Sequence, residues 1–234
     1  MEIYEQHGQE NQNGITLRTH MIHSFLWMFA GIAVTFLVAV GISLNSELQY
    51  QMMSSNFLWM GMMFAQIGVV IALSARISKI KTFTAKILFF VYAILTGVTF
   101  SVIGLVYTGE TIALAFGLAC LFFGSLVVIG YTTKRDLSKI GTLAIAGLMG
   151  MIVYGFLAAV FGWSVNDVLY SMIGLLIFIG ITAWDVQKMK KIYEMNKSDT
   201  KMLKKLSIYS ALSLYLDFVN IFLYILRILG SSRD

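Results

Sequence analysis

Seven apolar runs, each long enough to cross a lipid bilayer, follow one another along this chain with only short connections between them. A helix needs about 20 predominantly apolar residues to span the hydrocarbon core of a membrane. By that measure the spans cover roughly residues 22–44, 57–75, 87–107, 112–131, 142–163, 168–187 and 209–229. We therefore expect an all-α membrane protein, a bundle of seven transmembrane helices without a separate soluble domain.

The composition agrees with a membrane-embedded chain and excludes other classes. Apolar residues make up 58% of the 234 positions and charged residues only 12%, whereas a soluble domain has about 25% charged residues. A disordered chain has the opposite balance. The single cysteine, Cys120, excludes a disulfide framework and a cysteine-based metal site. Because the chain has no proline, any bend in a helix must arise at Gly or Ser.

Polar segments are confined to the two ends of the chain. We expect residues 1–19 to form a mobile polar N-terminus, residues 20–230 the transmembrane domain, and residues 231–234 a short polar tail. The first apolar run is too long for the core of a signal peptide, and no small-residue cleavage site follows it. We therefore interpret this run as a retained helix.

The distribution of Lys and Arg predicts the orientation of the bundle. Connections that carry these residues alternate with connections that carry none. A cytoplasmic N-terminus places fifteen of the 17 Lys and Arg residues on the inner side and two on the outer side, as expected for cytoplasmic loops. Topology thus explains the net charge of +5, and no binding of nucleic acid is implied.

Ionisable side chains inside a bilayer are the candidate functional residues, because each costs about 2.5–3.5 kcal/mol on insertion scales. Asp217 lies in the seventh span, in SLYLDFVNIFLY, roughly 12 Å from its inner end at 1.5 Å per residue. Asp185 lies in ITAWDVQKMK, about 4 Å inside the inner end of the sixth span. The depths differ by roughly 8 Å. Either a helix boundary is wrong by one turn, or a cation or water bridges the two groups.

If the two carboxyl groups meet, they can act as a proton switch. Like charges in a medium of low dielectric constant cannot both ionise cheaply, so such a pair tends to hold a proton. Two carboxylates also supply oxygen ligands for a hard divalent cation, and calcium is the one metal expected here, with no other cofactor. The structural alternatives are a neutral, hydrogen-bonded Asp217, and an Asp185 that pairs with Lys188 or Lys190 at the membrane boundary.

Two arginines lie near span ends. Arg76, at the inner end of the second span, is a candidate counter-ion for the aspartates, although an arginine there also satisfies the charge rule by itself. Arg227, near the outer end of the seventh span, is expected to extend its side chain to the membrane interface.

Small residues recur in several spans, including Gly97 and Ser101 in the third. They could line a path for a substrate, but close packing of helices is the commoner reason for such residues.

An enzymatic role is not expected. Intramembrane aspartyl proteases also place one Asp on each of two adjacent helices, but their second Asp follows Gly-x-Gly and they carry a Pro-Ala-Leu motif. Here Leu214, Tyr215 and Leu216 precede Asp217, and the chain has no proline. Both departures disfavour proteolysis.

Four segments together resemble the Bax inhibitor-1, or transmembrane Bax inhibitor motif, family in its bacterial branch. They are YAILTGVTFSVIGLVYTG (92–109), YTTKRDLS (131–138), ITAWDVQKMK (181–190) and ALSLYLDFVNIFLYILRILG (211–230). The resemblance covers nearly the whole chain from about Leu17. It implies a seven-helix bundle with helix 7 at its centre, spanning the bacterial inner (plasma) membrane many times.

The resemblance also implies a function and its residues. Family members resemble pH-sensitive calcium leak channels with a di-aspartyl sensor, whose positions match Asp185 and Asp217. This implies that the helix boundaries above, and not the pairing, are wrong. In some members an Arg near the end of helix 2 pairs with the helix 6 Asp, which matches Arg76. The chain departs from the family in having Trp184 and Val186 beside Asp185.

A second departure leaves two functions open. Some members have an acidic pore residue in helix 2, where this chain has only Gln66. The first hypothesis is a passive leak for calcium or other cations, gated by protons. The alternative is a non-transporting regulator that binds a membrane protease or another membrane protein.

Overall fold

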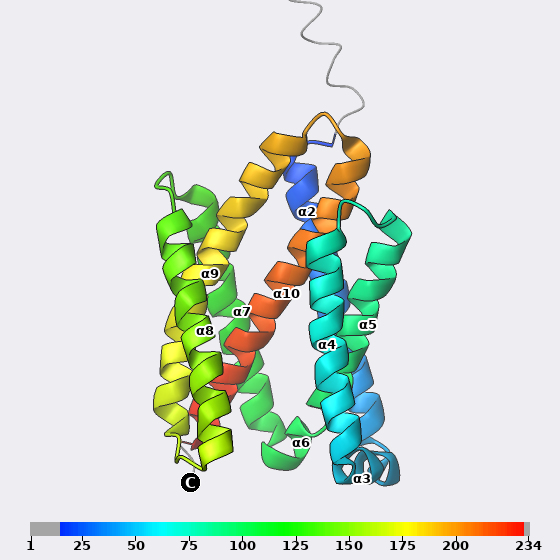
Figure 1. The fold of residues 1–234 in the computed structure, drawn as a ribbon, viewed down its shortest axis with the longest axis vertical. Helices are drawn as coiled ribbons and strands as arrows, with labels where there is room; N and C mark the ends of the chain where they lie inside the picture. The colour runs from blue at the N-terminus through cyan, green and yellow to red at the C-terminus, as the bar shows by residue number, and fades with distance from the viewer. Residues whose placement is uncertain (1–14, 232–234) are drawn as a thin grey trace, which may run out of the picture.

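The computed structural model describes residues 15–231, and this part of the chain is helical apart from its connections (Figure 1). The helices are α2 (Leu17–Ser43), α3 (Ser46–Ser54), α4 (Asn56–Arg76), α5 (Thr82–Phe100), α6 (Ile103–Val106), α7 (Gly109–Thr132), α8 (Ser138–Phe161), α9 (Asp167–Asn196) and α10 (Thr200–Ser231). Among these residues, seven helical stretches are long and apolar enough to cross a membrane, with α5 and α6 forming one of them. The predicted fold class is confirmed.

Helix α2, the first in the described residues, begins earlier than the sequence indicated. It starts at Leu17, inside the segment expected to be a polar N-terminus, because the side chain of Thr16 caps it by accepting a hydrogen bond from the backbone N–H of Thr19 at 3.2 Å. Residues 1–14 of the expected mobile segment, and residues 232–234 of the expected tail, lie outside the described residues.

The sixth and seventh spans extend well beyond the expected boundaries. Hydropathy predicts an end near residue 187 for the sixth span and a start near 209 for the seventh, but α9 continues to Asn196 and α10 begins at Thr200. The backbone N–H of Met202 donates to Asp199 Oδ1 at 2.9 Å, which caps the start of α10. Hydropathy does not detect these extensions, because their residues are largely polar although helical.

The third span is interrupted at a serine. α5 ends at Phe100 and α6 begins at Ile103, while the hydroxyl of Ser101 donates to the carbonyl of Val98 at 2.7 Å. The carbonyl of Ser101 is bound instead by the side-chain amide of Gln49 at 2.7 Å, from the short helix α3 that the sequence analysis missed. A bend at Ser in this proline-free chain agrees with the prediction.

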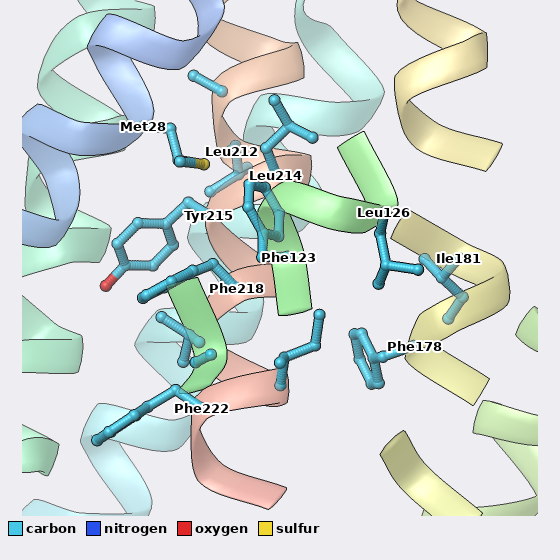
Figure 2. Packing of buried hydrophobic residues seen from close by; sticks show 14 of the residues in the cluster. Met28, Phe123, Leu126, Phe178, Ile181, Leu212, Leu214, Tyr215, Phe218 and Phe222 are labelled. Atoms are coloured by element: carbon cyan, nitrogen blue, oxygen red, sulfur yellow. The ribbon is translucent and has the colours of Figure 1, made fainter. Parts of the chain in front are cut away.

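α10 is the central helix of the bundle. It runs diagonally through the molecule in Figure 1 and packs against α9, α2, α7 and α5. Figure 2 shows its Tyr215, Phe218 and Phe222 among buried side chains from neighbouring helices. α4, in contrast, packs mainly against α5 and exposes most of its apolar residues. In a bilayer, exposed apolar side chains contact lipid.

Glycines allow the helices around the site to approach closely. A Cβ atom added at Gly130 of α7 would lie 2.5 Å from the backbone carbonyl oxygen of Ala183 in α9. One added at Gly97 of α5 would lie 2.7 Å from the carbonyl oxygen of Thr35 in α2. At these two positions the small residues serve helix packing.

We predict that Gly130→Ala destabilises the bundle by about 1–3 kcal/mol, because the new methyl group overlaps the backbone of α9. Gly124→Ala, on the same helix but with no atom within 4 Å of its added Cβ, is the matched control. It should be neutral or slightly stabilising, because Ala favours helix over Gly. Unfolding of the purified proteins in mixed micelles measures both; equal stability of the two variants would contradict the close crossing.

Candidate functional site

Asp185 and Asp217 both lie in the interface between α9 and α10. Their exposed fractions are 8% and 2%. On α9, Thr182, Asp185 and Lys188 are spaced by three residues, which places them on one face of the helix. α10 is largely surrounded by protein, so the bundle encloses the carboxyl group of Asp217.

The two helices run antiparallel, and facing residues give their relative register. The facing pairs are Thr182 with Asp217, Asp185 with Ser213, and Lys188 with Tyr209. Asp217 is four residues beyond Ser213, so it lies about 6 Å deeper than Asp185 at 1.5 Å per residue. The offset noticed in the sequence is therefore present. Both boundaries were wrong, as the resemblance implied, yet correcting them does not remove the offset.

Asp217 has an oxygen without a partner. Among the described residues, neither Asp217 Oδ2 nor the facing Thr182 Oγ1 has a hydrogen-bond partner, although both atoms are buried. No hydrogen bond joins Asp217 to Asp185, but the two carboxyl groups interact electrostatically. A buried polar atom without a partner is unfavourable. Asp217 therefore has the capacity to bind a proton, a water molecule or a cation.

The cation beside the aspartates is Lys188. Its Nζ lies 3.9 Å from Asp185 Oδ1, and it donates a hydrogen bond to the hydroxyl of Tyr209 in α10 at 3.2 Å. The same Nζ lies 4.9 Å from the centre of the Trp184 ring. Lys188 thus links α9 to α10 one turn to the cytoplasmic side of Asp185.

Arg76 is not brought to the pair. It is exposed at the end of α4, and within the described part of the chain it forms no ion pair with either aspartate. The physical reason is that α4 packs mainly against α5. The contact of this end with α10 is made beyond Arg76, where the carbonyl of Ser78 accepts a hydrogen bond from Lys205 Nζ at 2.8 Å. Lys188, and not Arg76, is therefore the cation beside Asp185. The pairing of Asp185 with Lys188 is one of the two boundary pairings that the sequence allows.

A glutamine missed by the sequence analysis fixes the α7–α8 connection to α9. Gln187 Oε1 accepts from the backbone N–H of Leu137 at 2.8 Å, and Gln187 Nε2 donates to the carbonyl of Arg135 at 2.8 Å. Gln187 is two positions after Asp185 in α9. A single glutamine at the end of a span belongs to no sequence motif, so no signal in the sequence could have identified this role.

A second contact of this connection joins Asp136 to Lys191 at 2.9 Å. Hydrogen bonds from Ser138, followed by the one from Lys191, lower the pKa of Asp136 from 3.8 to about 2. Because that pKa is lowered, any stabilisation is fully present above the ordinary value and is lost only as the pH falls through about 2. Asp136 therefore stays ionised between pH 5 and 8 and does not sense pH in that range.

The site offers few ligands for a resident metal. Within the described residues, no group of three or more His, Cys, Asp or Glu side chains gathers around a common point. Calcium takes six to eight oxygen ligands. Asp185 and Asp217 could supply carboxylate oxygens to such an ion, and hydroxyl oxygens, carbonyl oxygens or water would have to supply the rest.

Comparison with known proteins places the chain in a family. The family model described as inhibitor of apoptosis-promoting Bax1 matches residues 17–234. This chain belongs to the Bax inhibitor-1 family. The resemblance noted in the sequence is confirmed. The match includes both aspartates and the whole of the described bundle.

Bacterial relatives of this family member are similar over most of their length. The inner membrane protein YbhL of Escherichia coli is 38% identical over 221 residues, covering 93% of each chain. A Borreliella burgdorferi protein is 37% identical over 226 residues, covering 97% of each. The protein RP147 of Rickettsia prowazekii is 36% identical over 218 residues, covering 93% of this chain and 92% of its own. With seven membrane-spanning stretches, this chain is a multi-pass inner-membrane protein.

We predict that Asp217→Asn stabilises the bundle by about 1–3 kcal/mol at pH 8, because a neutral amide is less unfavourable in this buried position than a carboxylate with an unpartnered oxygen. Asp199→Asn is the control, since Asp199 is exposed and Asn caps a helix equally well. Unfolding in mixed micelles measures both. A loss of stability in Asp217→Asn would show that partners outside the chain, such as a bound cation, satisfy the carboxylate.

Proposed function

We propose that this protein is a pH-sensitive leak channel for cations, calcium among them, gated by Asp185 and Asp217 as a di-aspartyl proton switch. The observation that carries this proposal is the unpartnered oxygen of Asp217, buried in the central helix and electrostatically coupled to a second carboxyl group. A carboxyl group enclosed by a membrane bundle is unfavourable, and such groups commonly serve ion or proton pathways.

Lys188 gives the switch its direction. The ion pair between Asp185 and Lys188 lies within α9. An ionised Asp185 holds the Lys188 ammonium group in place, and Lys188 donates the hydrogen bond to Tyr209 that joins α9 to α10. Protonation removes the charge on Asp185 and weakens this link. We therefore expect the two helices to separate more readily as the pH falls, and cation flux to rise from pH 8 to pH 5.

The proposed ion is in transit and does not remain bound. Within the described residues, no third acidic or imidazole side chain joins the two carboxylates at the site. The site would therefore bind calcium weakly. Weak binding is a requirement for conduction, because an ion must leave as easily as it enters. Protons compete with the ion for the same oxygens. The proposal includes no catalytic step and no cofactor.

We predict that calcium flux into proteoliposomes rises as the pH is lowered from 8 to 5, and that Asp217→Asn and Asp185→Asn each flatten this dependence. The reason is that an amide cannot take up the proton that opens the channel. Flux is measured with a calcium-sensitive dye inside the vesicles, and each variant is checked for wild-type elution in size-exclusion chromatography.

Asp136→Asn is the matched control, because Asp136 is also a cytoplasmic-side carboxylate but remains ionised over this pH range. It should keep the wild-type pH dependence. If wild-type flux never exceeds that of empty liposomes at any pH, the leak is excluded. The function to test next would then be a non-transporting regulator that binds a membrane protease or another membrane protein.

A further inference from the structure

A cavity of about 400 Å³ lies at the outer end of the bundle, away from Asp185 and its cytoplasmic end of α9. Its walls come from the end of α8, the start of α9 and the end of α10, which lie together near the label C in Figure 1. The volume falls within the range of about 300–1,000 Å³ that small-molecule sites have. Neither aspartate of the proposed switch lines it, so it is a separate feature.

Two opposite charges line this cavity without neutralising each other. Arg227 of α10 and Asp167 of α9 both contribute to its walls and are both exposed. Neither forms an ion pair within residues 15–231. The guanidinium group can bind a phosphate through two parallel hydrogen bonds, and the carboxylate can accept hydrogen bonds from an ammonium group. A ligand that carries both groups would satisfy both side chains.

The remaining polar walls are held in place by packing. Tyr170 donates a hydrogen bond from its hydroxyl to the carbonyl of Met151 at 3.2 Å. Gly155 allows this approach, because a Cβ atom there would already lie 3.3 Å from the Tyr170 hydroxyl. The ring of Tyr107, another wall residue, lies against Gly230. The cavity is therefore formed before a ligand arrives, which favours binding.

The surroundings indicate that the ligand is part of a lipid. α8 ends at Phe161 and is followed by Gly162, which takes a positive φ of 68°. The next residue, Trp163, stacks on Phe161 with ring centres 5.5 Å apart. Both aromatic rings are exposed. Exposed aromatic residues at span ends typically lie at the level of lipid head groups. The charge distribution places this end outside the cytoplasm, where Arg227 is one of only two basic residues.

We propose that this cavity binds the head group of phosphatidylethanolamine in the outer leaflet, with Arg227 on the phosphate and Asp167 on the ammonium group. Phosphatidylglycerol has the phosphate but no cation for Asp167. Phosphatidylcholine has a cation without N–H donors, so it cannot hydrogen-bond to the carboxylate. The chemistry of the cavity therefore favours ethanolamine over both.

The test is native mass spectrometry of the delipidated full-length protein, titrated with the three phospholipids carrying identical acyl chains. Wild type should bind phosphatidylethanolamine most tightly. Arg227→Gln should weaken that binding about tenfold or more, since hydrogen bonds to charged groups are among the stronger ones. Asp167→Asn should retain phosphatidylglycerol binding and lose the preference for ethanolamine. Glu110→Gln, which removes another exposed carboxylate at the start of a helix, should behave as wild type.

Two results would overturn the proposal. One is equal affinity for the three lipids in wild type and in both cavity variants, which would mean that the acyl chains alone are bound. The other is displacement of the lipid by soluble phosphoethanolamine at a similar concentration, which would assign the cavity to a free solute. Both variants replace exposed side chains, and their unfolding is measured alongside to confirm that the bundle is intact.

Discussion

A carboxyl group in the middle of a membrane protein has to be enclosed by protein, because contact with hydrocarbon would be too unfavourable. Asp217 meets this condition only because α10 packs against α9, α2, α7 and α5. The central position of α10 in Figure 1 is therefore what allows this helix to contain Asp217. The close crossings at Gly97 and Gly130 keep the surrounding helices near enough to enclose it.

The arrangement around the two aspartates is staggered and asymmetric. Asp185 lies near the cytoplasmic side with a lysine at 3.9 Å, whereas Asp217 lies about one turn deeper with an unpartnered oxygen. Two carboxyl groups in such different surroundings differ in how readily they give up a proton. Thr182 is the residue of α9 that faces Asp217. Under the proposed function, a proton and a passing cation would compete for this site.

Much of the fold could be predicted because the bilayer imposes simple rules on sequence. Span length predicted seven helices, and the structure has seven stretches of that kind in its described residues. The lack of proline restricted any bend to Gly or Ser, and the alternation of basic connections predicted the orientation. The cytoplasmic extensions of α9 and α10 could not be predicted, because hydropathy detects apolar segments and does not detect helices made of polar residues. Asp217 could be selected from the cost of burying a charged group, and Asp185 because it lies on the preceding, antiparallel helix.

The partners of the aspartates could not be predicted in the same way. The choice between Arg76 and Lys188 depends on where α4 packs. The apolar residues of α4 are equally compatible with contact to lipid and contact to protein, so they do not indicate its position. The role of Gln187 could not be predicted from the sequence either, because it depends on the position of the α7–α8 connection. Long-range packing decides such contacts, and no local spacing encodes it.

The central claim is that the buried aspartate pair takes up a proton between pH 8 and pH 5. Infrared difference spectroscopy of the protein in lipid bilayers measures this directly, through the carbonyl stretch of a protonated carboxyl group. The account predicts that this band grows as the pH falls in wild type and in Asp136→Asn, and that it is lost or much reduced in Asp217→Asn. An unchanged band in wild type, or equal growth in Asp217→Asn, would contradict it.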